Sequence, residues 1–235
     1  VVGPVLRGPD QPLAPPPQTA STVIQTTRSY TSAEMLKTPV FWLMYVMFVA
    51  VGASGLMATA QIGPIANDWA MNKTILFLGA TALSVALIVD QVLNGLARPF
   101  FGWVSDRIGR EKTMAIAFTS SAAMYWLLAN FGQGNPWTFV ICAGMIFFTW
   151  GEIFSLFPSM CTDTFGPKYA TANTSFLYTA KGTAAFAVPL ANVLKDATGT
   201  WSTVFFVASV TDIVVVVLAL TVLRPMRART IASRG

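Results

Sequence analysis

The stretch 40-VFWLMYVMFVAVGASGLMATA-60 carries no charged residue from one end to the other. A helix needs about 20 apolar residues to cross the hydrocarbon core of a bilayer, and this stretch is long enough. Five more apolar blocks follow it, at residues 75–98, 113–130, 137–157, 171–194 and 201–223. They are too long and too evenly apolar to be the strands of a membrane barrel, which alternate in character over about ten residues. The sequence therefore predicts an all-α polytopic membrane protein with six transmembrane helices.

The composition of the whole chain agrees with this class. Of its 235 residues 54% are hydrophobic and 11% are charged. In a typical soluble domain about a quarter of the residues are charged. The expected solvent is a bilayer, with membrane lipid as the surroundings of the helices.

Lys and Arg are unevenly distributed among the connections between these blocks. One side of the membrane would carry Lys73 and Lys195 alone. The other side would carry eleven cations: Arg7, Arg28, Lys37, Arg107, Arg110, Lys112, Lys168, Arg224, Arg227, Arg229 and Arg234. Because the richer side normally faces the cytoplasm, we expect a multi-pass protein of the cell (inner) membrane with both termini cytoplasmic. The formal net charge of +5 reflects this topology, and we expect no nucleic-acid partner.

The chain divides into three parts. Residues 1–37 are rich in Pro, Thr and Ser, and we expect them to form a cytoplasmic linker without packed structure. Residues 38–223 would form the transmembrane part, and residues 224–235 a basic cytoplasmic tail. A chain that opens in a linker is expected to have begun further upstream.

The sequence offers little that suits enzyme chemistry or metal binding. Cys142 and Cys161 both fall in or at the end of the fourth block, which argues against a disulfide framework. The chain has no His, so a zinc site is not expected. We recognise no nucleophile motif, phosphate loop or metal cluster. We therefore expect neither an enzyme nor a bound cofactor or metal.

The connection between the second and third blocks has a recognisable pattern. It reads 98-RPFFGWVSDRIGREKTM-114 and fits G-x-x-x-D-R-x-G-R-x-[KR], with the fixed positions at Gly102, Asp106, Arg107, Gly109, Arg110 and Lys112. We expect Gly102 to allow close approach of neighbouring helices and Gly109 to permit a tight turn. Asp106 would lie near the positive N-terminus of the following helix, and the cations would hold the loop at the cytoplasmic face. An ordinary basic loop is the alternative interpretation.

This connection resembles the signature of the major facilitator superfamily, in which it joins the second and third helices of a six-helix half. Transporters of that family have twelve spans in two six-helix halves, separated by a long cytoplasmic linker. By this resemblance the chain corresponds to that linker and to the second half, helices 7–12. The N-terminal six-helix half would then be a missing partner.

Two segments, 94-NGLARPFFGWVSDRIGR-110 and 149-TWGEIFSLFPSMCTDTFGPKYATANTSFLYTAKG-182, resemble the oxalate/formate antiporter family more narrowly. The similarity extends from about residue 41 to residue 223. In that family an arginine in helix eight and a lysine in helix eleven hold a dicarboxylate between aromatic side chains. The resemblance implies exchange in which oxalate enters and formate leaves.

The resemblance also implies which residues bind the substrate. Arg98 and Lys181 match the two cationic positions, with the same separation along the chain. Trp150 matches an aromatic pocket position in helix ten. Phe154 and Tyr178 stand where well-studied members carry other aromatic residues.

The spacing of side chains supports a shared lining without reference to the family. Residues three, four or seven apart lie on one face of a helix. Three faces meet this condition: Gln91, Asn94 and Arg98 in the second block, Trp150, Phe154, Phe157 and Cys161 in the fourth, and Thr174, Tyr178, Lys181 and Ala185 in the fifth. Together they offer the cationic, hydroxylic and aromatic lining that a small planar anion requires.

A charge near the middle of a span costs roughly 2.5–3.5 kcal/mol, so it normally faces a cavity or a partner. Lys181 lies about ten residues from either end of its block. An ion pair with Asp90, Glu152 or Asp212 would neutralise it without any substrate, and Arg98 is close enough to the cytoplasmic loop to reach lipid headgroups. For the three acids we expect hydrogen-bonded structural roles, with Glu152 packed between helices. A proton relay is the alternative.

These observations predict a secondary active transporter that exchanges small carboxylate anions by alternating access. Two facing cations suit a dianion, because one carboxylate can pair with each. The alternatives are a proton-coupled monocarboxylate symporter, with Asp90 or Glu152 as the proton carrier, and a non-transporting membrane fragment. Uptake that follows external pH without internal counter-substrate would favour the symporter. An upstream six-span half in the same reading frame would argue against the fragment.

Overall fold

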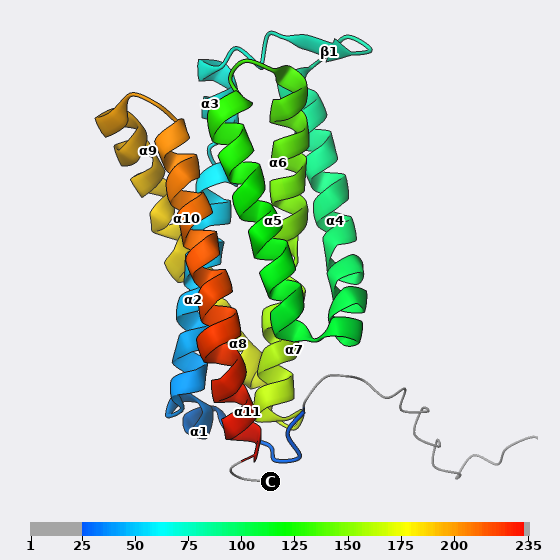
Figure 1. Cartoon of the computed structure of the whole chain (residues 1–235), viewed down its shortest axis with the longest axis vertical. Helices are drawn as coiled ribbons and strands as arrows, with labels where there is room; N and C mark the ends of the chain where they lie inside the picture. The colour runs from blue at the N-terminus through cyan, green and yellow to red at the C-terminus, as the bar shows by residue number, and fades with distance from the viewer. Residues whose placement is uncertain (1–24, 233–235) are drawn as a thin grey trace, which may run out of the picture.

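The structure, a computed structural model, describes residues 25–232, and helices make up most of them (Figure 1). The long helices run along a common axis, and the connections that reverse the chain lie at one end of the bundle or the other. The elements in chain order are α1 (Ser32–Leu36), α2 (Pro39–Thr59), α3 (Ile62–Asp68), β1 (Ile75–Phe77), β2 (Ala80–Thr81), α4 (Ala82–Ile108), α5 (Arg110–Phe131), α6 (Pro136–Gly151), α7 (Ile153–Phe165), α8 (Ala170–Ala185), α9 (Ala187–Thr198), α10 (Ser202–Leu218), the π-helical turn η1 (Ala219–Leu223) and α11 (Arg224–Ala232).

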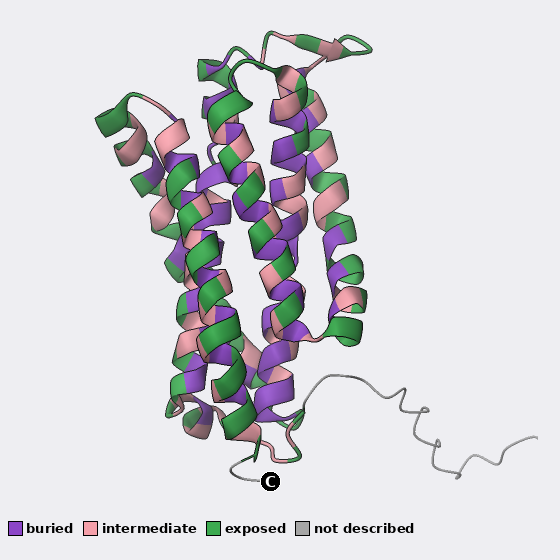
Figure 2. Ribbon diagram, viewed as in Figure 1, coloured by how far each residue is buried: buried purple, intermediate pink, exposed green. Residues whose placement is uncertain are grey.

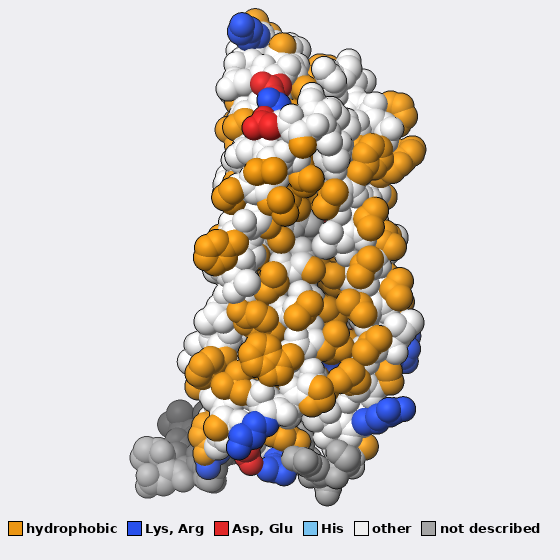
Figure 3. All heavy atoms as spheres, turned by 90° about the vertical axis from the view of Figure 1, so that its left-hand side faces the viewer, with side chains coloured by type: hydrophobic (Ala, Val, Ile, Leu, Met, Phe, Trp, Pro, Cys, Tyr) orange, Lys and Arg blue, Asp and Glu red, His pale blue; other side chains and the backbone are white. Residues whose placement is uncertain are grey.

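The outer surface of the bundle is apolar. Figure 2 shows buried residues along the inward faces of the helices and exposed residues along the outward faces. Many of the exposed side chains are large and apolar, among them Val46 (57% exposed), Ile141 (57%) and Val210 (63%). Figure 3 shows such side chains covering one face between the two ends. Continuous apolar surface of this extent is rare on soluble monomers. The predicted all-α polytopic membrane fold is confirmed.

Four helical segments in residues 25–232 are long and apolar enough to cross a membrane. They are Pro39–Thr59, Arg110–Phe131, Pro136–Phe165 and Ser202–Ala232. The predicted blocks 75–98 and 171–194 are not among them. The first of these carries Asp90 and Arg98, and the second is interrupted and carries Lys181. Six membrane spans therefore remain a prediction.

The start predicted for the second block is wrong. Residues 75–81 form a two-stranded antiparallel hairpin of β1 and β2 instead of helix. At its tip Leu78 (φ 48°) and Gly79 (φ 82°) have the positive φ angles of a tight hairpin turn. Helix α4 begins only at Ala82, after Thr81 caps it by accepting a hydrogen bond from the Ser84 amide at 3.3 Å.

Two of the predicted continuous spans are broken in the structure. Glu152 separates α6 from α7, and Phe186 separates α8 from α9. Pro158 and Pro189 lie within the two segments that follow these breaks. Because proline has no amide hydrogen, each removes one helical hydrogen bond. The backbones of Glu152 (φ −66°, ψ −28°) and Phe186 (φ −64°, ψ −16°) stay in the right-handed helical region, so each interruption is local.

Residues 224–232 of the predicted basic cytoplasmic tail are helical and packed against the bundle. The chain continues from α10 through η1 into α11 without leaving helical structure. Arg227 is 4% exposed, donates a hydrogen bond to Thr164 at 2.7 Å and forms an ion pair with Glu111. These contacts hold α11 against α5 and α7. Residues 233–235 lie outside the described part.

The predicted linker is packed over its last part. Residues 1–24 lie outside the described residues, but Tyr30 (1% exposed) and Met35 (0%) are buried. The Tyr30 amide donates to the Phe165 carbonyl at 2.8 Å, and their rings meet edge to face with centroids 5.6 Å apart. A capping box of Thr31 and Glu34 starts α1, and the hydrogen bonds from Thr31 lower the pKa of the Glu34 carboxyl. The expectation of unpacked structure is therefore wrong for residues 25–37.

The predicted loop at residues 98–114 is almost entirely helical. Helix α4 runs to Ile108, and α5 begins at Arg110, so that Gly109 alone separates them. Its φ of 93° with ψ of 155° is a conformation that only glycine adopts readily, which confirms the tight turn expected there. The close approach expected at Gly102 is wrong for the described residues, because an added Cβ would meet no atom within 4 Å.

The two ends of the bundle differ in charge. Helices α1 and α11, the α4–α5 turn and the α7–α8 turn lie at one end, which we call the basic end (Figure 1). The cations of the basic end include Lys37, Arg107, Lys112, Lys168 and Arg224. The hairpin, α3 and the α9–α10 turn lie at the other end, with Lys73 and Lys195. Figure 3 shows cations gathered at the basic end and few at the other.

Substitution of Gly166 tests the packing of residues 25–30. Gly166 (φ 86°, ψ 161°) and Gly109 have nearly the same backbone conformation. An added Cβ at Gly166 would lie 2.4 Å from the carbonyl oxygen of Arg28, whereas one at Gly109 would meet nothing. We expect Gly109→Ala to cost about 1–3 kcal/mol from backbone strain alone. We expect Gly166→Ala to cost about 1–3 kcal/mol more, because its neighbours must move.

The measurement is thermal unfolding of the two purified variants in detergent, with Gly109→Ala as the matched control. Equal losses of stability in both variants would mean that residues 25–30 do not pack on the turn after α7.

Candidate functional site

Aromatic rings from several helices gather around Phe154, near the start of α7. The Trp150 ring of α6 meets the Phe154 ring edge to face, with centroids 5.3 Å apart. The Tyr178 ring of α8 is stacked on it at 6.5 Å, with an angle of 12° between the planes. Phe48 of α2 meets Phe154 at 6.2 Å and Tyr178 at 6.0 Å. Phe154 is therefore the centre of an aromatic cluster built by four elements.

Two cations face the ring of Phe154. The Nζ atom of Lys181 lies 4.9 Å from the ring centroid, and the Cζ atom of Arg98 lies 5.5 Å from it. Such contacts are worth about 0.5–2 kcal/mol, depending on how far the cation is from water. Lys181 comes from α8 and Arg98 from α4, and both side chains are exposed in the structure. The five residues predicted to bind substrate are thus neighbours around one ring.

Neither cation is neutralised within the described residues. No ion pair or hydrogen bond of residues 25–232 includes Arg98 or Lys181. The alternative of an ion pair between Lys181 and Asp90, Glu152 or Asp212 therefore does not occur there. The two positive charges are left to face the aromatic cluster and the space beside it.

The intramembrane acids are all buried. Asp212 accepts a hydrogen bond from the Ser54 hydroxyl at 2.7 Å, as expected of a structural acid. Asp90 and Glu152 are 0% exposed, and their carboxyl oxygens have no hydrogen-bond partner in the part of the chain that the structure describes. The expectation of hydrogen-bonded roles is therefore wrong for these two. Glu152 does pack between helices, and it forms no ion pair with Arg98 or Lys181.

A proline sets the position of Tyr178. In an α-helix the amide of residue i+4 donates to the carbonyl of residue i, but Pro158 has no amide hydrogen. The Phe154 carbonyl is therefore free, and the Tyr178 hydroxyl donates to it at 3.0 Å. This hydrogen bond joins α7 to α8 and fixes Tyr178 one helical turn from Lys181.

Sequence reasoning missed two residues of α2. Phe48 belongs to the cluster, and Gly55 makes room for Trp150, because an added Cβ would lie 2.1 Å from the indole ring. The indole nitrogen of Trp150 is buried without a partner among the described residues. The spacing of Gly52 and Gly55 in an otherwise bulky block is a signal of close helix approach that was available in the sequence.

The helix face predicted for Trp150, Phe154, Phe157 and Cys161 is wrong in part. Phe157 and Cys161 were expected to line the cavity with Phe154, but both are fully buried. Phe157 stacks on Phe48 with centroids 4.8 Å apart, and the Cys161 sulfur lies 4.0 Å from that of Met35. Two features explain this difference. The helix is interrupted at Glu152, and residues spaced three or four apart do not stay exactly in line along a helix. Phe157 and Cys161 therefore face the core. Asn94 likewise packs toward α6, donating to the Phe147 carbonyl at 3.4 Å.

The loop motif forms an ion-pair network at the basic end. Arg110 is 9% exposed and pairs with Asp106 of α4 at 2.8 Å and with Asp163 of α7 at 2.9 Å. The guanidinium of Arg107 lies over the Trp103 ring at 3.8 Å. Three helices are therefore tied together by one buried arginine. This position lies at the end of the bundle, apart from the aromatic cluster.

These features define an integral membrane protein of the all-α class. The sequence profile of the Major Facilitator Superfamily matches residues 43–235. The chain therefore belongs to this family, whose members are transporters and not enzymes, and the resemblance noted in the sequence is confirmed.

Three relatives illustrate the similarity. Over 198 residues the chain is 33% identical to the oxalate:formate antiporter of Oxalobacter formigenes. These aligned residues make up 84% of the chain and 46% of that protein. The chain is 33% identical over 152 residues to the uncharacterized 38 kDa protein in the 23S RNA operon of Thermoproteus tenax, covering 62% and 36%. It is 30% identical over 152 residues to the uncharacterized MFS-type transporter YhjX of Escherichia coli (strain K12), covering 64% and 36%. The chain spans less than half the length of each relative.

The contact between Tyr178 and the Phe154 carbonyl can be tested by a double-mutant cycle. Tyr178→Phe removes one hydrogen bond and should cost about 0.5–1.5 kcal/mol. In a Pro158→Ala background the new amide at position 158 can donate to the same carbonyl, so Tyr178→Phe should cost clearly less. The midpoint of thermal unfolding in detergent measures both.

Tyr45→Phe is the control, because the Tyr45 hydroxyl bonds to Thr183 at 2.8 Å and is independent of Pro158. Its cost should be the same in both backgrounds. A Tyr178→Phe cost that does not change with Pro158→Ala would contradict the proline as the cause of this contact.

Proposed function

We propose that the chain is the second half of a secondary active transporter that exchanges small carboxylate anions by alternating access. The observation that carries the proposal is the pair of cations, Arg98 and Lys181, which face one ring without an acid partner among the described residues. Phe154, Trp150 and Tyr178 provide the aromatic walls. No covalent chemistry, metal or cofactor is required of these residues.

The charges favour a dianion as the substrate. One carboxylate can pair with the guanidinium of Arg98 through a planar fork, and the second with the ammonium of Lys181 as a point charge. A monoanion would leave one cation unpaired in surroundings of low dielectric constant, which is unfavourable. The flat aromatic walls suit a small planar molecule. Oxalate has this charge and shape, and the named activity of the Oxalobacter formigenes relative supports oxalate and formate as the substrate class.

The same charges favour exchange over net transport. An empty site would have to carry two unpaired cations through the conformational change, at a high cost in electrostatic free energy. A bound anion lowers that cost on both movements: a dianion pairs both cations, and a monoanion such as formate pairs one of them. Oxalate entering and formate leaving therefore form one cycle that moves net negative charge.

The architecture proposed for the complete protein has two halves. The six helical segments of this chain would be helices 7–12, and an N-terminal six-helix half would cover the face that carries Arg98 and Lys181. The 198 aligned residues cover 46% of the Oxalobacter formigenes relative, which supports this arrangement. Both termini would lie in the cytoplasm of a cell with the transporter in its inner membrane.

Removal of the lysine charge tests the substrate site. Lys181→Gln in the complete protein should lower oxalate exchange in proteoliposomes on the order of a hundredfold, because Arg98 alone cannot neutralise two carboxylates. Lys181→Arg should retain part of the activity, since the charge is kept but the larger planar head fits the aromatic walls less well. Insertion into the membrane should not suffer, because loss of an intramembrane charge favours insertion.

Lys168→Gln is the control, since Lys168 is an exposed cation at the basic end and outside the cluster. It should exchange oxalate at the wild-type rate. A correctly inserted Lys181→Gln protein with wild-type exchange would make the lysine structural and the proposed site wrong.

The orientation is tested by cysteine labelling in intact cells. A cysteine in place of Lys73, next to the hairpin, should react with a membrane-impermeant maleimide from outside. A cysteine in place of Lys112, at the basic end, should react only after the membrane is permeabilised. Both positions are cations at opposite ends of the bundle, so each serves as the control for the other. The reverse labelling pattern would overturn the proposed topology.

A further inference from the structure

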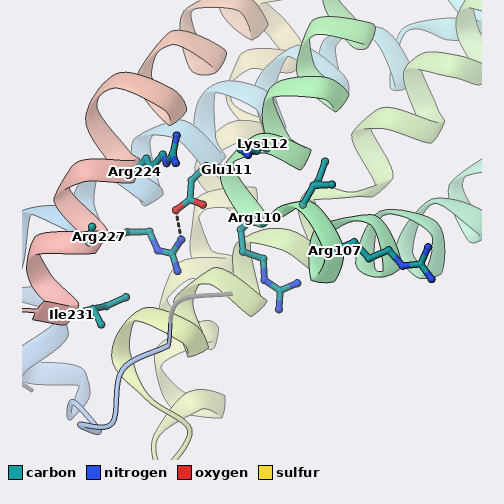
Figure 4. Close-up of a pocket in the computed structure, with 10 residues that line it drawn as sticks. Arg107, Arg110, Glu111, Lys112, Arg224, Arg227 and Ile231 are labelled. Carbon is teal, nitrogen blue, oxygen red and sulfur yellow. Dashed lines mark hydrogen bonds and ion pairs between the residues drawn. The ribbon is translucent and has the colours of Figure 1, made fainter. Parts of the chain in front are cut away.

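The basic end contains a cavity that is separate from the aromatic cluster. It has a volume of about 510 Å³ and lies between the α4–α5 turn and α11 (Figure 4). Five cations and one acid line it, together with apolar and small residues: Arg107, Ile108, Gly109, Arg110, Glu111, Lys112, Arg224, Arg227, Ala228 and Ile231. We call it the basic pocket.

Two of the cations in the basic pocket already have partners. Arg110 is bonded to Asp106 and Asp163. Arg227 forms its ion pair with Glu111, and Figure 4 shows it reaching from α11 toward that carboxylate. The single acid of the pocket is therefore already used, and the pocket keeps an excess of positive charge.

Donors remain for a further anion. Lys112 and Arg224 are exposed, and neither makes an ion pair with any described residue. Figure 4 shows Arg224 extending from α11 toward the α5 side of the pocket. Arg227 is 4% exposed, and one nitrogen of its guanidinium has no hydrogen-bond partner. That nitrogen is enclosed by protein atoms, so the donors open to a further anion are those of Lys112 and Arg224.

The walls of the basic pocket and its place in the bundle indicate the kind of anion. Ile108, Ala228 and Ile231 give it an apolar side. It lies at the basic end of the bundle, between the α4–α5 turn and α11, and Ile108 in its lining is 37% exposed. A ligand that fits both features has an anionic head and apolar chains. Basic pockets between transmembrane helices are known to bind lipid headgroups, and arginine binds phosphate oxygens through two parallel hydrogen bonds.

We propose that the basic pocket binds the phosphate headgroup of an anionic phospholipid. Lys112 and Arg224 contact the phosphate, and the acyl chains leave along Ile108 and Ile231 onto the apolar surface. A lipid held in this way links the α4–α5 turn to α11. The site lies outside the proposed transport site and does not depend on it.

The test is native mass spectrometry of the purified protein in detergent, with dioleoyl phosphatidylglycerol as the probe and dioleoyl phosphatidylcholine for comparison. The double variant Lys112→Gln and Arg224→Gln should bind phosphatidylglycerol roughly thirtyfold more weakly, with phosphatidylcholine binding unchanged. Each single variant should lose roughly fivefold, which keeps the proposal testable if the double variant cannot be purified.

The matched control is the double variant Lys168→Gln and Arg229→Gln, which removes the same charge at the same end but outside the basic pocket. Its phosphatidylglycerol affinity should stay within about threefold of wild type, because the charges that contact the headgroup are kept. Equal losses of phosphatidylglycerol affinity in both double variants would mean that the lipid is attracted by the overall charge of the basic end, and they would overturn the proposal. Displacement of the lipid by an equal concentration of sn-glycerol 3-phosphate would make the ligand a soluble phosphate and overturn the assignment to lipid.

Discussion

Two positive charges held over one aromatic ring, without a negative partner, are the constraint around which the rest of the structure can be understood. Arg98 and Lys181 approach the Phe154 ring to 5.5 and 4.9 Å, and the described acids of the bundle interior lie elsewhere. Charges in the interior of a membrane protein are costly unless they face a partner or a cavity. Under the proposal made above, an anion from solution supplies the counter-charge to Arg98 and Lys181, and the aromatic walls limit its shape.

Irregularities in the helices explain how the bundle positions the two cations and the aromatic rings around Phe154. The break at Glu152 separates Trp150 from the α7 residues, and Pro158 frees the carbonyl that positions Tyr178. Gly55 lets α2 approach the Trp150 indole. At the basic end, Arg110 ties α4 and α5 to α7 through Asp163.

Much of this organisation could be predicted from the sequence. Apolar block length predicted the membrane fold, and the five residues assigned to the site lie together, because charge in an apolar block and aromatic spacing are local signals. Other features depend on tertiary contacts that leave no local signal. Residues 25–37 are packed because Tyr30 contacts Phe165. The Pro-rich composition of the preceding sequence gives no indication of this contact. The apolar residues at 75–77 become a strand because Leu78 and Gly79 turn the chain. Gly102 fits the motif, but a Cβ added there would meet no atom within 4 Å among the described residues.

The most direct test of the central claim is counterflow in proteoliposomes made with the complete protein. Labelled oxalate outside should accumulate in vesicles loaded with oxalate or formate and should stay out of empty vesicles, because the unloaded cation pair of Arg98 and Lys181 cannot reorient at low cost. External acid should have little effect on this exchange. Uptake into empty vesicles that is driven by a proton gradient would contradict the account and identify a proton-coupled symporter instead.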